Sequence, residues 1–230
     1  ASADHDTHLT LGGRDWRAYP ENDGMVFQDT QGLLDLPAPA LTGLHQIMNA
    51  GTAIAAARQL NLPESAIREG LAAATWPARL QRLSCGALVA RVQHQAPHAR
   101  LWLDGGHNAA AAQALSGWAQ SLAGKPLKTQ SGETRLDIIL AMLNTKAHAD
   151  FMENLKPLAP FAQLHCVPID GQPNAISPDV LTRAAGKVGL KARAHDSLQA
   201  ALEVVPPTAQ DVLICGSLYL AGQALRANRG

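Results

Sequence analysis

From residue 99 to the C-terminus, short and almost continuously apolar runs alternate with segments of helical periodicity. The runs expected as strands are RLWLDG, RLDIILAML, LHCVPI, KARAHD and DVLICGS, and ALVARV at residues 87–92 is interpreted in the same way. The segments expected as helices are AAAAQALSGWAQSL, AHADFMENLKPL, SPDVLTRAAGKVG, SLQAALEVV and YLAGQALRAN. This alternation predicts an α/β fold whose mostly parallel sheet is covered by helices on both faces. Ligands of such sheets bind at the carboxyl ends of the strands.

The first third of the chain has a different pattern. Residues 8–36 contain short β-leaning runs, HLTLGG, DGMVFQD and GLLDLP, separated by turn clusters such as YPENDG, and they predict a small meander of strands. Two helices are expected next, over TGLHQIMNAGTAIAAARQLNL and over PESAIREGLAAA. Pro77 prevents a helix from continuing into TWPARLQRL, so we place a domain boundary there, with domains at residues 1–77 and 78–230.

Composition excludes several classes of partner. Lys plus Arg equals Asp plus Glu, at 19 each, which gives no indication of binding to nucleic acid or to an anionic membrane. The cysteines, Cys85, Cys166 and Cys215, are odd in number and form no CxxC pair, which predicts reduced thiols in a cytoplasmic protein. No apolar run approaches the roughly 18 residues of a membrane helix, and the N-terminus lacks the pattern of a signal peptide.

Polar residues at the ends of these elements are the candidates for chemistry. His45 and Asn49 in GLHQIMNA are four residues apart on one helix face, where they are either site residues or ordinary surface polar groups. Arg79 in WPARLQ lies at the proposed domain junction, and its planar guanidinium suits a phosphate or, equally, an interdomain salt bridge.

The segment LDGGHN joins a strand to a helix. Asp104 ends the strand, Gly105 and Gly106 permit unusual backbone angles, and His107 and Asn108 precede a helix N-terminus, which favours anions. The segment lacks GxGxxG and is therefore not a dinucleotide-binding fingerprint; a plain strand-to-helix turn is the alternative.

Other motifs are weaker. Ser217 in LICGSLYLAG follows a strand, but GxSxG is absent, which disfavours a serine hydrolase. No GxxxxGK[ST] phosphate loop exists in the chain. A metal site in DHDTH is set aside because terminal segments are usually mobile. We interpret five other histidines as surface or strand-edge residues: His94, His98, His148, His165 and His195.

Six motifs in order carry a family resemblance: GRDW, LPAPALTGLHQIMNAGTAIAA, WPARLQ, LDGGHNAAAA, AMLNTK and CGSLYLAG. Together they resemble the folylpolyglutamate synthase / dihydrofolate synthase proteins of the Mur ligase superfamily, which form amide bonds with ATP. The resemblance implies a P-loop ATPase domain followed by a smaller Rossmann-like domain. Residues 1–77 then correspond to the tail of the ATPase domain, and residues 78–230 to the C-terminal domain. The P-loop part would be missing, so we expect a fragment that is inactive by itself.

The resemblance assigns roles residue by residue. Asn49 matches an asparagine near the adenine, and Arg79 a hinge arginine that reaches the ATP phosphates. Asp104 matches an aspartate that holds the nucleotide through its ribose. His107 matches a histidine near the incoming glutamate or acyl phosphate, and Ser217 a serine that helps to hold glutamate. The expected catalytic residues are therefore Arg79, Asp104 and His107.

Three departures from the family pattern stand out. Lys146 in NTK lies where relatives often have DKD, with Thr145 and Ala147 in place of the acidic residues, so its role is open. Gly106 replaces a commoner alanine, which we expect to be a mild change. Ala109 replaces the usual proline at the start of the helix, which leaves the geometry of that start in question.

The implied reaction begins with phosphorylation by ATP of the carboxylate of dihydropteroate or of a folate glutamyl tail. The amine of L-glutamate then attacks the acyl phosphate. ATP and Mg²⁺ are the implied cofactors, with the Mg²⁺ ligands mainly in the missing part, and the partners are these small molecules, with no nucleic acid or membrane, bound by a monomer. Two alternatives remain: another Mur-type ligase acting on a peptidoglycan precursor, and a non-catalytic Rossmann-like binding module.

Overall fold

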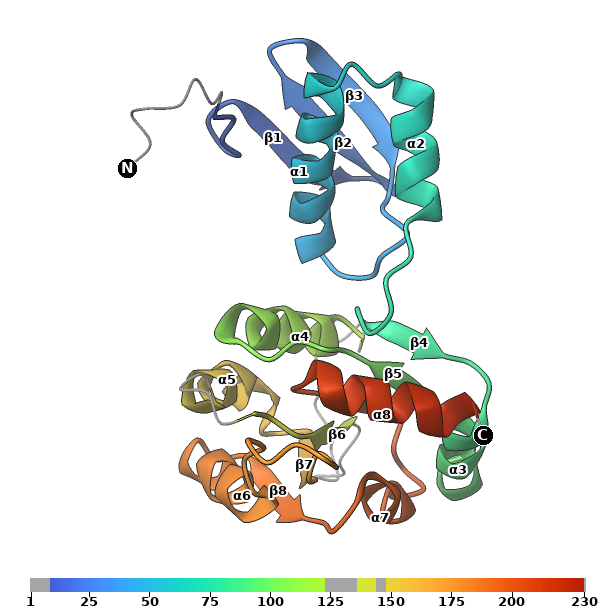
Figure 1. Ribbon diagram of the computed structural model, residues 1–230, viewed down its shortest axis with the longest axis vertical. Coiled ribbons are helices and arrows are strands. Elements are labelled where there is room, and N and C mark those ends of the chain that lie inside the picture. The colour runs from blue at the N-terminus through green and yellow to red at the C-terminus, as the bar shows by residue number, and fades with distance from the viewer. Residues whose placement is uncertain (1–8, 123–135, 144–147, 230) are drawn as a thin grey trace. The chain divides into compact units, whose positions relative to one another are not determined.

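The computed structural model describes residues 9–122, 136–143 and 148–229 (Figure 1). The chain divides into two compact units, residues 1–76 and residues 77–230, and the division lies beside Pro77. Each unit encloses its own hydrophobic core.

The first unit combines an antiparallel three-stranded meander with two helices. Its elements are β1 (Trp16–Glu21), β2 (Gly24–Asp29), β3 (Gly32–Pro37), α1 (His45–Gln59) and α2 (Glu64–Ala73). Its core joins both layers: Trp16 stacks on Phe27 with ring centroids 5.7 Å apart, and Ile54 of α1 and Leu71 of α2 belong to the same buried cluster.

The meander begins later than the sequence predicts. Residues 9–11 of the expected strand HLTL lie outside any strand, and β1 is formed instead by WRAYPE, which includes part of the predicted turn cluster. The turn between β1 and β2 is short, with Asn22 in the left-handed region at φ 50°. Pro20 is tolerated because β1 lies at the edge of its sheet, where a missing N–H donor costs little.

The second unit has the predicted α/β architecture, which is confirmed. Its six-stranded sheet has the order β4 (Gln81–Leu83), β5 (Arg100–Leu103), β9 (Asp211–Cys215), β6 (Leu136–Leu140), β7 (Ala162–Cys166) and β8 (Lys191–Ala194). The pairs from β5 to β8 are all parallel, and only β4 runs antiparallel to its neighbour. The helices are α3 (Ala87–Gln95), α4 (Ala109–Ser121), α5 (His148–Leu155) with the 3₁₀ turn η1 (Lys156–Leu158), α6 (Pro178–Lys187), α7 (Leu198–Glu203) and α8 (Leu218–Arg229).

One predicted strand is wrong, because ALVARV forms the helix α3. A short run rich in valine and leucine fits either a strand or a buried helix, and its periodicity does not distinguish them. The helix is supported from elsewhere in the chain: the Asn228 side-chain oxygen accepts the backbone N–H of Leu88 at 3.1 Å, which satisfies a donor at the helix N-terminus. The strand at this edge is β4, which begins at Gln81, two residues after Arg79.

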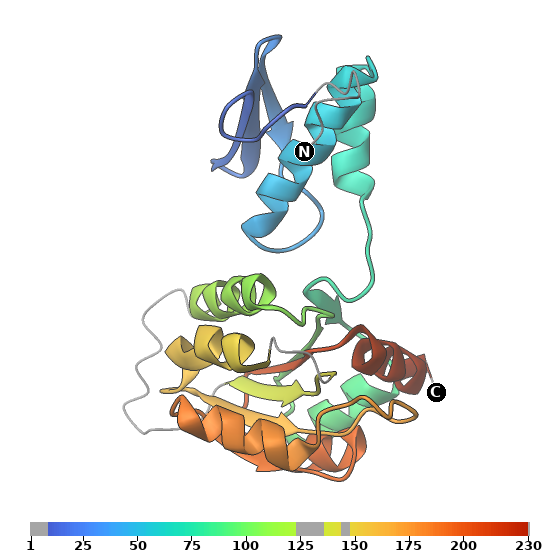
Figure 2. The ribbon, with the colours of Figure 1, turned by 60° about the vertical axis from the view of Figure 1, so that its left-hand side comes forward.

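Helices cover both faces of the sheet (Figures 1 and 2). Buried side chains of α4, α5 and α6 share one cluster with Ile138 and Leu140, whereas those of α3, α7 and α8 share the other with Ile139. The alternation along β6 places its neighbouring residues on opposite faces, so the strand is buried on each side. The central position of β9 brings the carboxyl ends of β5, β9 and β6 side by side.

A buried polar network crosses β6, β7 and the segment after β8. His165 Nε2 lies 2.8 Å from Asp137 Oδ1, and His165 Nδ1 lies 2.9 Å from His195 Nε2. Asp137 is fully buried and His165 is 2% exposed, so the interpretation of His165 as a surface or strand-edge residue is wrong. The strand LHCVPI looks apolar, and the partners that allow its histidine to be buried lie about thirty residues away in each direction.

Acid should destabilise the second unit through this network. Burial lowers the pKa of His195, and His165 and Arg193 lower it further, against the opposite effect of Asp196. Below about pH 6.5 the unfolded chain therefore binds a proton that the folded unit resists, so the free energy of unfolding falls as the pH falls. We expect the free energy of unfolding of His195→Gln, measured by urea denaturation, to fall less between pH 7 and pH 5 than that of the wild type. Equal losses would contradict this account.

Candidate active site

Arg79 lies between two residues with an unusual backbone. Ala78 and Leu80 have φ of 56° and 43°, in the left-handed region that residues with a side chain seldom occupy. Ala78 and Leu80 are 3% and 1% exposed, while Arg79 is only half-buried. The loop thus buries the two apolar neighbours and leaves the arginine accessible.

The Asp104 carboxylate holds this loop. Asp104 Oδ2 accepts the backbone N–H of Leu80 at 2.8 Å, and Oδ1 accepts that of Gly106 at 2.6 Å. A backbone hydrogen bond of 2.8 Å from Gly105 N to the Ala78 carbonyl oxygen lies beside them. We call these three bonds the Asp104 clasp; they join the Arg79 loop to the LDGGHN turn.

The two glycines of the turn allow the close approach. A Cβ on Gly105 would collide with the side chain of Leu218, and a Cβ on Gly106 would lie 2.6 Å from Ala111 Cβ and 2.7 Å from Asp104 Oδ1. Alanine at position 106 therefore requires a neighbour to shift in this chain. The expectation that Gly106 is a mild change does not fit this packing.

His107 and Asn108 complete the turn. The carbonyl oxygen of Gly105 can only accept, so His107 Nδ1, 3.0 Å away, is the donor. Neutral His107 then carries its lone pair on Nε2, and the side chain is exposed. Asn108 is the N-cap of α4, with its side-chain oxygen 2.9 Å from the N–H of Ala111. The helix begins at Ala109 without the usual proline.

Ser217 lies beside the turn, after β9. The N–H of Gly216 donates to the Gly106 carbonyl oxygen at 3.1 Å, so the two segments are joined. The Ser217 hydroxyl oxygen accepts the N–H of Tyr219 at 3.1 Å in the first turn of α8. Ser217 is 3% exposed, and in this structure its hydroxyl satisfies a backbone N–H donor at the start of α8.

Two buried thiols, Cys215 and Cys166, lie at the carboxyl ends of β9 and β7. Burial raises the pKa of Cys215 well above its ordinary value, and the nearby Asp104 carboxylate raises it further. Burial raises the pKa of Cys166 to about 11. Since the thiolate is the reactive form, neither cysteine is suited to nucleophilic catalysis.

In the first unit, α1 carries a row of amide and imidazole groups. Asn49 Nδ2 donates to Gln46 Oε1 at 2.9 Å, and Gln46 Nε2 lies 2.9 Å from His45 Nε2. Gln46 and Asn49 border an apolar groove of about 380 Å³ between α1 and α2, whose lining includes Ile54 and Ile67. Sequence reasoning missed Gln46, which is 3% exposed and orients Asn49.

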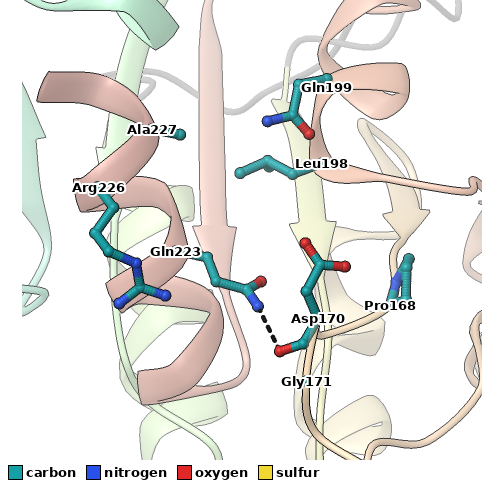
Figure 3. A pocket seen from close by; sticks show the side chains of 8 residues that line it. All are labelled: Pro168, Asp170, Gly171, Leu198, Gln199, Gln223, Arg226 and Ala227. Atoms are coloured by element: carbon teal, nitrogen blue, oxygen red, sulfur yellow. Dashed lines mark hydrogen bonds between the residues drawn. The ribbon is translucent and has the colours of Figure 1, made fainter. Parts of the chain in front are cut away.

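A polar hollow of about 470 Å³ lies elsewhere on the second unit (Figure 3). Asp170 comes from the loop after β7 and Arg226 from α8, and Gln223 Nε2 donates to the Asp170 carbonyl oxygen at 2.9 Å. No predicted site residue lines this hollow. It is therefore separate from the Asp104 clasp.

Several predictions lie outside the described residues, namely the DHDTH segment (Asp4, His5, Asp6, His8) and the NTK segment with Lys146. Across the described parts of the chain, no group of three or more His, Cys, Asp or Glu side chains could hold a metal ion. None of the helices described is long and apolar enough to cross a membrane.

Comparison with solved structures first defines the class. The chain shares its fold with the UDP-N-acetylmuramate-alanine ligase MurC from Thermotoga maritima, with a TM-score of 0.56 at 13% identity over 93% of this chain and 44% of that one. The Escherichia coli FolC structure in complex with DHPP and ADP is more similar, with a TM-score of 0.71 at 26% identity over 94% of this chain and 46% of that one. The fold is thus that of Mur-type ligases.

The family follows from sequence. The profile of the family described as dihydrofolate synthetase, C-terminal domain, matches residues 88–227, and the chain belongs to this family. A folylpolyglutamate synthase from Lacticaseibacillus casei is 31% identical over 203 residues, which cover 85% of this chain and 41% of that protein. The dihydrofolate synthase/folylpolyglutamate synthase of Escherichia coli is 27% identical over 219 residues. The chain spans less than half the length of these relatives, and the predicted resemblance is confirmed.

Gly216 should be intolerant of a side chain. At φ 98° its added Cβ would lie 2.5 Å from the Ala141 carbonyl oxygen, so we expect Gly216→Ala to lower the free energy of unfolding by about 1 to 3 kcal/mol. Gly117→Ala is the matched control: nothing surrounds that position in the interior of α4, so the change should stabilise by about 0.5 to 1 kcal/mol. Chemical denaturation measures each, and equal effects would contradict the strain at Gly216.

Proposed function

We propose that the full-length protein is a cytoplasmic, monomeric ligase that joins L-glutamate to dihydropteroate, to folate polyglutamate tails, or to both, with ATP. The reaction proceeds through an acyl phosphate. This chain supplies the glutamate-side half of the site and is inactive by itself. The family match over residues 88–227 carries the proposal, because it covers the LDGGHN turn and Ser217 together.

Arg79 is proposed to bind the transferring phosphate. Within the described residues, its guanidinium has no hydrogen-bond or ion-pair partner, although its loop is held by the Asp104 clasp. A half-buried cation of this kind can accept a phosphate without first breaking an internal ion pair. Phosphoryl transfer asks the protein chiefly for such positioning and for charge stabilisation.

The adjacent groups are proposed to act on the other substrates. His107 has its Nε2 lone pair available in the neutral ring, which suits an interaction with the glutamate ammonium, the proton donor beside the acyl phosphate. Ser217 lies at the start of α8, where backbone N–H groups favour a glutamate carboxylate. Asp104 is assigned to the ribose side of the nucleotide by the family resemblance.

The first unit is proposed to bind the adenine. Asn49 presents a carboxamide held by Gln46, and the apolar groove beside it offers a surface for the flat ring. Adenine pairs well with carboxamides, which both donate and accept. Mg²⁺ would neutralise phosphate charge when bound; no group of three or more His, Cys, Asp or Glu side chains in the described parts of the chain could hold it.

Substitution of Arg79 tests the proposal. In the full-length gene product, Arg79→Ala should lower kcat/KM for ATP about 100-fold or more, because one cation is lost from the transferring phosphate. Arg79→Lys should retain only part of the wild-type kcat/KM, because lysine cannot form two parallel hydrogen bonds to a phosphate as arginine does. Arg82→Ala removes an exposed arginine of β4 and should leave turnover unchanged.

The assay follows glutamate-dependent ATP hydrolysis with dihydropteroate, with a folate polyglutamate, or with a UDP-sugar peptide as the acceptor. We expect turnover with the pterin acceptors and none with the 230-residue chain alone. Turnover only with the UDP-sugar peptide would assign the enzyme to peptidoglycan precursors. Wild-type turnover by Arg79→Ala would overturn the role of this arginine.

A further inference from the structure

We propose that Asp104 is a positioning residue: its carboxylate sets the place of the Arg79 guanidinium through the loop backbone. Asp104 does not touch Arg79 by any hydrogen bond in the described structure; it binds the N–H of the next residue, Leu80. The catalytic consequence rests on the proposed function, whereas the clasp itself is independent of it.

The position of the Arg79 guanidinium depends on the backbone of its loop. No group in the described parts of the chain binds its guanidinium by a hydrogen bond or ion pair, so the backbone of the loop sets the direction in which the side chain starts. That backbone is anchored by the buried neighbours Ala78 and Leu80 and by the clasp. A change in the clasp is therefore a change in the position of the cation.

The clasp also holds two residues in a backbone conformation that is unfavourable for them. Two residues with side chains in the left-handed region, Ala78 and Leu80, flank Arg79, and such a pair persists only when surrounding contacts determine it. One carboxylate oxygen of Asp104 accepts the N–H of Leu80, and the carbonyl oxygen of Ala78 accepts the N–H of Gly105. Each strained residue is thus held by one bond from the turn.

The same turn reaches the glutamate side of the proposed site. Asp104 Oδ1 fixes the N–H of Gly106, and the carbonyl oxygen of Gly106 accepts the N–H of Gly216, which precedes Ser217. A continuous set of hydrogen bonds therefore runs from the Arg79 loop to the start of α8. Asp104 lies at its centre and is 6% exposed.

A rescue experiment separates this role from direct nucleotide contact. Asp104→Asn keeps one acceptor oxygen and places an amide N–H₂ against the other backbone donor, so kcat of the full-length enzyme should fall about 100-fold. Adding Ala78→Gly relaxes the strain, since glycine adopts positive φ freely, and should restore kcat about tenfold. Asn22→Gly relaxes another left-handed residue, at φ 50° in the first unit, and should restore nothing.

Amide hydrogen exchange tests the hydrogen bonds of the clasp independently of enzyme turnover. In the 230-residue chain, Asp104→Asn should accelerate exchange at Leu80 and Gly106 at least tenfold, whereas Asp170→Asn, on an exposed carboxylate, should leave both unchanged. Unchanged exchange in Asp104→Asn would overturn the clasp. Failure of Ala78→Gly to rescue kcat would overturn the positioning role, whether or not KM for ATP is raised, and would leave Asp104 only the ribose contact proposed above. A wild-type enzyme that ligates no glutamate would refute the proposed function while the exchange result still decides the clasp.

Discussion

The Asp104 carboxylate is the interaction on which this site depends. Asp104 directly follows β5, and its two carboxylate oxygens accept backbone N–H groups from the loop before β4 and from the turn before α4. The turn also accepts the N–H of Gly216, which follows β9. One buried side chain therefore connects, directly or through the turn, three segments at the carboxyl ends of the strands. The fold brings these segments together, and the carboxylate fixes their geometry.

Most of the second unit could be predicted from sequence, because buried parallel strands are continuous apolar runs and the helices between them have clear periodicity. The errors fall where local sequence fits two structures. ALVARV forms a helix, and the N–H of Leu88 near its start is satisfied by Asn228, 140 residues away. In the first unit, WRAYPE rather than HLTL forms the edge strand, a position at which its proline is tolerated.

The candidate residues could be named from ordered motifs, but their arrangement could not. Nothing in WPARLQ indicates that Ala78 and Leu80 adopt positive φ, since neither is a residue that favours it. The use of Asp104 in backbone hydrogen bonds depends on tertiary contact, as does the burial of His165 between Asp137 and His195. Sequence identifies which groups are present, and packing decides which of them remain available to a ligand.

A crystal structure of the full-length protein with a non-hydrolysable ATP analogue tests the central claim most directly. The account predicts that Asp104 keeps its hydrogen bonds to the N–H groups of Leu80 and Gly106 while the Arg79 guanidinium binds a phosphate oxygen. A ribose hydroxyl that approaches the remaining lone pairs of the carboxylate is compatible with this result. An Asp104 side chain that leaves both amides and binds only the ribose, with the Arg79 loop unchanged, would contradict the account.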